Sequence, residues 1–142
     1  MSEIVCLVRG GEAGRNTQEQ AIEYARGTGK KLVFLHIINP AGLVLDNEKM
    51  LEPVLQEQTW LARVSLSQAR QRAERRGMKA DMTIRKGAFV ETVEAYVEEK
   101  SVERVYLGMP RKEGPDYEMR LERVHSFARR LEENLNVEVA IV

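Results

Sequence analysis

The stretch that decides the fold reads Lys31-Leu32-Val33-Phe34-Leu35-His36-Ile37-Ile38. Its leucine, valine, isoleucine and phenylalanine residues form a nearly continuous apolar run, which is typical of a strand buried on both faces of a parallel sheet. Four further runs share this character, at residues 4–8, 79–84, 104–107 and 137–142. Because each run adjoins a helical pattern, the sequence predicts an α/β domain with a five-stranded parallel sheet.

Apolar residues at helical spacing predict four helices, over residues 17–28, 48–76, 88–99 and 117–135. In the second helix an approximate apolar stripe begins at Leu51 and reaches Ala73, and the other face is charged. The fourth helix has the most regular period, which begins at Tyr117.

Composition limits the function further. The chain has 142 residues, a common size for one domain, and we expect a single domain over residues 1–142. Lys plus Arg equals Asp plus Glu at 22 each, so no net field draws the chain to nucleic acid or to an anionic membrane. Cys6 is the only cysteine, and no His, Cys or Asp spacing resembles a metal site. Because neither a signal peptide nor a membrane-length apolar run is visible, we expect a cytoplasmic protein.

Two weakly patterned stretches are candidates for a binding site. They follow the second and fourth predicted strands, at residues 39–47 and 108–116. Ligands of open parallel sheets bind beyond the carboxyl ends of the strands, so we expect the second stretch to define the activity. Cationic residues at these ends could form a rim for an anion, and the alternative is solvated loop charge. They are Arg9, Arg85, Lys86, Arg111 and Lys112.

Several segments, in order along nearly the whole chain, carry a family resemblance. The first strand and its turn read Val5-Cys6-Leu7-Val8-Arg9-Gly10-Gly11-Glu12, and the second strand ends in Leu35-His36-Ile37-Ile38. The chain closes with Ser126-Phe127-Ala128-Arg129-Arg130-Leu131 and Val137-Glu138-Val139-Ala140-Ile141-Val142. Together these segments resemble the universal stress protein family. The resemblance implies a three-layer, doubly wound fold of the adenine nucleotide alpha hydrolase-like type, with strand order 3-2-1-4-5.

The same resemblance points to a changed nucleotide site. Nucleotide-binding members carry Gly-x-x-Gly after the fourth strand, then a spacer and Gly-Ser or Gly-Thr, because glycines let backbone amides close on phosphates. Gly108 matches the first glycine, whereas Arg111 and His125 stand at the second and third positions. Gly114 is a candidate replacement in a remodelled loop, and Arg9 replaces an acidic residue near the adenosine. We therefore expect a lost or altered ATP site.

The candidate ligand-binding residues come from these family positions and from the cationic rim. They are Arg9, Gly10, Ile37, Gly108, Arg111, Lys112, Gly114, His125 and Ser126. The sequence supplies no base and orienting acid for Ser126, so nucleophilic catalysis is not expected.

Three functions stay open at this point. The leading hypothesis is a non-catalytic regulatory or stress-response module that acts by binding and that needs no cofactor. The alternative is a member that binds ATP or AMP and hydrolyses slowly or switches with nucleotide. The third is a docking domain for a separately encoded transporter or enzyme. In the resembled family the last strand commonly pairs with its counterpart in a second subunit, so we expect a homodimer through Val137, Val139 and Ile141.

Overall fold

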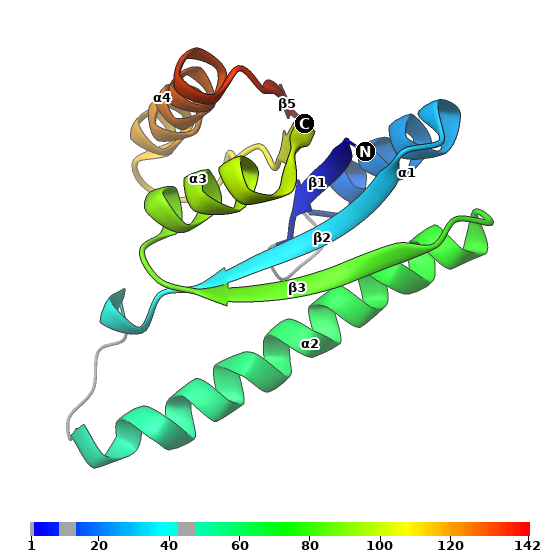
Figure 1. The fold of residues 1–142 in the computed structure, drawn as a ribbon. Helices are drawn as coiled ribbons and strands as arrows, with labels where there is room; N and C mark the ends of the chain where they lie inside the picture. Colours follow the sequence, from blue (N-terminus) through cyan, green and yellow to red (C-terminus); the bar gives the residue numbers. More distant parts are fainter. Residues whose placement is uncertain (1, 9–13, 43–47) are drawn as a thin grey trace.

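The computed structural model describes residues 2–8, 14–42 and 48–142, which form a sheet with helices on both sides (Figure 1). The elements are β1 (Glu3–Leu7), α1 (Arg15–Thr28), β2 (Lys31–Ile38), η2 (Pro40–Gly42), η3 (Glu48–Met50), α2 (Leu51–Arg75), β3 (Ala80–Lys86), α3 (Phe89–Lys100), β4 (Val102–Leu107), α4 (Tyr117–Leu135) and β5 (Glu138–Ile141). The predicted strands and helices are all present, and their bounds differ from the prediction only at the ends.

All strand pairs of the sheet are parallel, in the order β3-β2-β1-β4-β5. The central strand β1 lies between β2 and β4, with Cys6 opposite Phe34 on one side and Tyr106 on the other. This topology confirms the α/β fold and the strand order 3-2-1-4-5. In the part of the chain with described structure, no helix is long and apolar enough to span a bilayer.

The two faces of the sheet carry separate cores. Residues of β1 and β2 that point to one side, such as Phe34, share a core with α1 and α2, to which Leu66 of α2 belongs. Their neighbours, such as Leu35, point to the other side and share a core with α3 and α4, to which Leu131 of α4 belongs. Both groups are almost fully buried, as the apolar runs predict for strands covered on both faces.

The first half of α2 departs from the expectation of one continuous packing stripe. The helix has 25 residues, which at 1.5 Å per residue is about 37 Å, whereas the 7 residues of β3 span about 23 Å. Figure 1 shows α2 running past the end of β3. Only Ala62, Leu66, Ala69 and Ala73 of α2 are buried.

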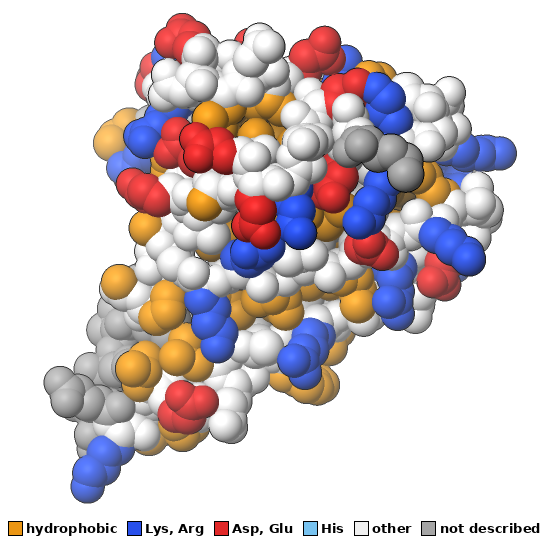
Figure 2. Space-filling model, in the orientation of Figure 1, with side chains coloured by type: hydrophobic (Ala, Val, Ile, Leu, Met, Phe, Trp, Pro, Cys, Tyr) orange, Lys and Arg blue, Asp and Glu red, His pale blue; other side chains and the backbone are white. Residues whose placement is uncertain are grey.

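The projecting part of α2 therefore exposes apolar side chains, and Figure 2 shows hydrophobic atoms gathered over it. Trp60 is 63% exposed and Leu61 46% exposed, although Leu61 belongs to the predicted stripe. The stripe prediction is wrong at Leu51, which is 38% exposed beyond the end of the sheet, and at Leu61, which faces away from the sheet because its neighbour Ala62 is the buried residue.

Candidate functional site

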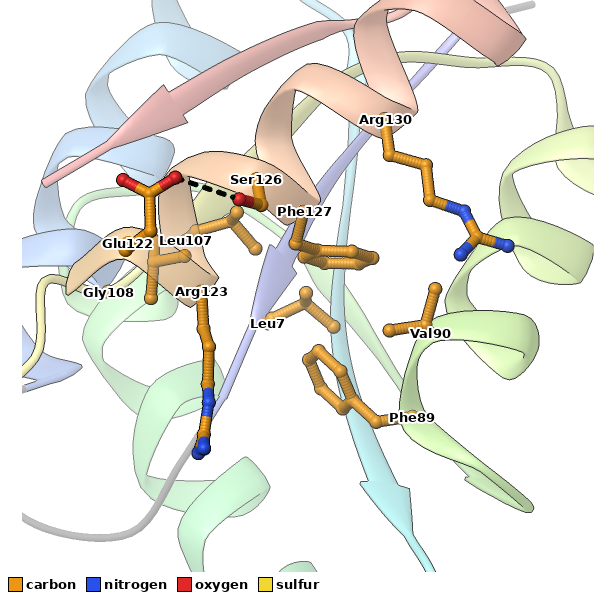
Figure 3. Close-up of a pocket in the computed structure, with 11 residues that line it drawn as sticks. Leu7, Phe89, Val90, Leu107, Gly108, Glu122, Arg123, Ser126, Phe127 and Arg130 are labelled. Carbon is orange, nitrogen blue, oxygen red and sulfur yellow. Dashed lines mark hydrogen bonds between the residues drawn. The ribbon is translucent and has the colours of Figure 1, made fainter. Parts of the chain in front are cut away.

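A cavity of about 500 Å³ opens between α3 and α4, at the carboxyl ends of β1 and β4 (Figure 3). This is the end of the sheet where the sequence predicts a ligand site. The cavity is lined by Leu7, Phe89, Val90, Leu107, Gly108, Glu122, Arg123, Val124, Ser126, Phe127 and Arg130. Of the candidate residues whose structure is described, only Gly108 and Ser126 are in this lining.

The inner wall of the cavity is apolar. Leu7 and Leu107, at the ends of β1 and β4, line it together with the rings of Phe89 and Phe127, whose centroids lie 5.3 Å apart. The Phe89 and Val90 side chains come from the first two residues of α3. A cavity of this size with apolar and aromatic walls is typical of small-molecule sites.

A glycine turn places Phe89 and Val90 over the sheet. Gly87 has φ +147°, and its backbone N–H donates to the Ile38 carbonyl at 2.9 Å. The Thr92 amide then donates to the Ala88 carbonyl and starts α3. A Cβ on Gly87 would lie 2.5 Å from Thr92 Oγ1, so both the backbone and the packing require glycine here.

The polar side of the cavity is formed by α4. Ser126 Oγ donates to Glu122 Oε1 at 3.2 Å, and Arg129 Nη2 donates to the same oxygen at 3.1 Å. These bonds, chiefly the one from Arg129, lower the pKa of Glu122 from its usual value. Arg130 makes two hydrogen bonds to Glu94 of α3, at 3.1 and 2.8 Å.

The predicted phosphate position lies inside α4. The helix begins at Tyr117 and continues through His125 and Ser126 without a break. The free amides of a helix belong to its first turn, so the amides of His125 and Ser126 are engaged within the helix. Because His125 replaces the third glycine of the family signature, nothing interrupts the helix at this point.

Arg120 organises the loop that precedes α4. Its Nη2 donates to the Glu113 carbonyl at 3.1 Å and its Nε donates to the Pro115 carbonyl at 3.3 Å. Gly114 has φ +93° and Asp116 has φ +62°, so the loop turns sharply where Arg120 holds it. The sequence analysis missed this residue. The sequence does predict Arg120 in the first turn of α4. Helical side chains point back toward the N-terminus of their helix, so this position directs Arg120 at the loop that precedes α4.

Gly108 continues the pairing of β4 with β5. The Met109 amide donates to the Val142 carbonyl at 2.8 Å, and the Val142 amide donates to Leu107 at 2.9 Å. A Cβ on Gly108 would lie 3.5 Å from Thr17 Oγ1, an ordinary contact. Packing within the chain therefore leaves room for a larger residue, although Gly108 borders the cavity.

The structure does not bring the predicted cationic rim together. Arg85 turns toward α3, where it contacts Glu99 at 3.5 Å, and its guanidinium lies 5.3 Å from the centroid of the Tyr96 ring. Strands β2 and β1 separate β3 from β4, so Arg85 and Lys86 are about 14 Å of sheet away from the loop with Arg111 and Lys112. Arg111 and Lys112 are exposed.

The remaining candidate residues have varied positions. Ile37 of β2 is half-buried and packs against the core on the α3 and α4 side. Next to Ile37, His36 has its Nδ1 2.8 Å from the Val8 carbonyl oxygen, a contact within the fold. Arg9 and Gly10 lie outside the described residues.

The predicted dimer edge is only partly available. Among the described strands, β5 pairs with β4 alone, so within this part of the chain its other side is an open edge. Val137 precedes the strand and is 4% exposed, which makes it a core residue. Val139 and Ile141 are partly buried against the same core.

Phe89, Val90 and Arg123 are lining residues that the sequence analysis did not identify. Whether these residues line a cavity depends on the distance between α3 and α4, and hydrophobic periodicity in a sequence does not predict that distance. Within the ranges given above, no cluster of His, Cys, Asp or Glu could hold a metal ion.

Comparison with known proteins extends these observations. The model of the universal stress protein family matches residues 1–142. No curated protein matches the chain.

Solved structures of that family share the fold. Universal stress protein UspA from Lactobacillus plantarum has a TM-score of 0.79 at 14% identity, with 99% of this chain and 97% of that chain covered. A family member from Burkholderia pseudomallei has a TM-score of 0.71 at 19% identity, covering 99% and 95%. The universal stress protein from Archaeoglobus fulgidus, solved in complex with dAMP, has a TM-score of 0.65 at 16% identity, covering 99% and 96%.

Proposed function

Because the chain belongs to the universal stress protein family, we propose that it is a non-catalytic stress-response module that acts by binding. In this proposal the family's ATP site is altered, and the module works as a homodimer in the cytoplasm. The single observation that carries the proposal is the continuity of α4 through His125 and Ser126. A phosphate needs free backbone donors, and at this position the helix uses its amides internally.

The side chains around Ser126 also favour binding over catalysis. A nucleophilic serine needs a base that accepts its proton. The neighbour of Ser126 is Glu122, whose carboxylate is held in its ionised form by Arg129. A carboxylate with a lowered pKa is a weak base, so this arrangement provides little activation.

The dimer part of the proposal rests on the open edge of β5. An exposed strand edge presents unpaired backbone groups, and pairing with a second copy would satisfy them. Light scattering tests this directly: we expect the mass of two chains, and a protein that stays monomeric at high concentration would reject the dimer.

The alternative function is adenine nucleotide binding. A relative was solved with dAMP, and the cavity of this chain lies at the carboxyl ends of β1 and β4 beside Gly108. In that case Gly108 and Gly114 would contact the phosphates through a loop that differs from the glycine signature of nucleotide-binding members.

Thermal unfolding with millimolar ATP, AMP, dAMP or inorganic phosphate separates the two functions. A dissociation constant a hundredfold below the ligand concentration would raise the free energy of unfolding by about 2.7 kcal/mol. We expect no nucleotide-specific rise. A rise with ATP or AMP that Ser126→Ala abolishes, and that the matched surface variant Asn134→Ala on the same helix retains, would overturn the proposed function.

A further inference from the structure

We infer that the cavity between α3 and α4 binds an apolar molecule with a single anionic head, with a medium-chain carboxylate as the simplest member of this class. The inference deepens the proposed function and rests on it, since it gives the altered site a ligand of a different chemistry.

The first argument is the nature of the walls. Leu7, Leu107 and Phe127 are buried residues that nevertheless border about 500 Å³ of open space, and Phe89 and Val90 close the side formed by α3. Burying an apolar chain there would remove its surface from water at about 25 cal/mol per Å². A triphosphate would gain nothing from these walls, because it needs donors and counter-charges rather than apolar surface.

The second argument is the charge at the cavity mouth. Arg123 and Arg130 extend from α4 on either side of the apolar residues (Figure 3). Arg130 pairs with Glu94, and Glu122, the one acidic residue in the described part of the lining, pairs with Arg129. Among the residues with described structure, no carboxylate pairs with Arg123.

Arg123 therefore supplies one unmatched positive charge beside an apolar cavity. A guanidinium binds a carboxylate through parallel N–H donors, which favours an anionic head over a neutral or cationic one. One charge suits one anionic group, so a carboxylate fits the mouth better than a polyphosphate.

Isothermal titration with ligands of one chain length and different heads tests the inference. The probes are decanoate, 1-decanol and decyltrimethylammonium, each below its aggregation concentration, with AMP as a fourth. We expect saturable binding of decanoate, binding of 1-decanol weaker by about tenfold, and weaker binding still of the cation.

Variants locate the site. Val90→Phe fills the cavity and should abolish decanoate binding, and Val124→Phe does so from α4 if the first variant does not fold. Arg123→Gln should weaken decanoate binding by about tenfold and leave 1-decanol unchanged. The matched control is Arg75→Gln, an exposed arginine outside the lining, which should bind decanoate normally.

Three results would overturn the inference. They are equal affinities for decanoate and 1-decanol, equal effects of Arg123→Gln and Arg75→Gln, and decanoate binding that survives a folded cavity-filling variant. In the last case the ligand would bind elsewhere, for example on the exposed part of α2. AMP binding reports separately on the proposed function. Failure of all the decanoate tests without AMP binding would reject the inference and leave the proposed function standing.

Discussion

The two faces of this sheet use similar apolar residues to different ends. On the α1 and α2 side, Phe34, Leu66 and Ala69 fill the space between strand and helix, and their exposure is 0–1%. On the α3 and α4 side, the core borders a cavity that Phe127 helps to line. The difference teaches that two equally buried cores can be finished differently: one face, the closed face, is filled by its helices, and the other leaves a cavity between α3 and α4.

The largest effect should come from a truncation on the closed face. Phe34→Ala removes a ring from a filled core and should lower the free energy of unfolding by about 3–5 kcal/mol. Phe127→Ala should lower it by less, because that ring already borders open space. Urea unfolding of both variants measures the contrast. Equal losses would mean that the two faces are packed alike.

Adding volume should sharpen the same contrast. Ala69→Phe forces a ring into the closed face and should cost about 1–3 kcal/mol. Val90→Phe directs a ring into the cavity and should change the free energy of unfolding by less than about 1 kcal/mol, since no existing atoms need to move. Comparable destabilisation of both variants in urea unfolding would contradict the cavity.

The turn before α3 should be sensitive to a single methyl group. Gly87→Ala places a Cβ 2.5 Å from Thr92 Oγ1 on a backbone with φ +147°, so we expect a loss of about 1–3 kcal/mol in unfolding free energy. The control is Gly27→Ala, inside α1 with nothing within 4 Å, which should stabilise by up to about 1 kcal/mol. Thermal unfolding of the two variants should move in opposite directions, and a stabilised Gly87→Ala would refute the strained turn.

At neutral pH the smallest effect concerns the thiol of the closed face. Burial raises the pKa of Cys6 from its ordinary value of 9.0 to about 12. Below pH 9 the thiol is neutral in both states and costs nothing. As the pH rises from 9 toward 12 the unfolded chain releases the proton first, so the free energy of unfolding falls by about 1.4 kcal/mol per pH unit.

Cys6→Ala should remove that component of the pH slope, and the difference between the two proteins isolates it from other titrating groups. In the folded protein at pH 8, a thiol reagent should react with Cys6 only as fast as the chain opens. Rapid labelling of the native protein would show that the face is not closed.

Much of the fold was predictable because it depends on local pattern. The run at residues 31–38 became β2 with the same bounds, and the regular stripe from Tyr117 became α4. The exposure of Leu51 was not predictable, since a periodic stripe does not reveal where the sheet beneath it ends. The site was predicted only in its location: Gly108 and Ser126 border the cavity, whereas Phe89 and Arg123 depend on the distance between two helices that are remote in sequence.

The projecting half of α2 has a spectroscopic consequence. Trp60 is the only tryptophan of the chain. It is 63% exposed, and it lies in the first half of α2 rather than in the lining of the cavity. Its fluorescence should be that of a solvated indole, open to quenching by iodide and silent to anything that enters between α3 and α4. A blue shift of that emission would instead report that another molecule covers α2 around Trp60. Trp60 is therefore an intrinsic fluorescent probe for association at α2.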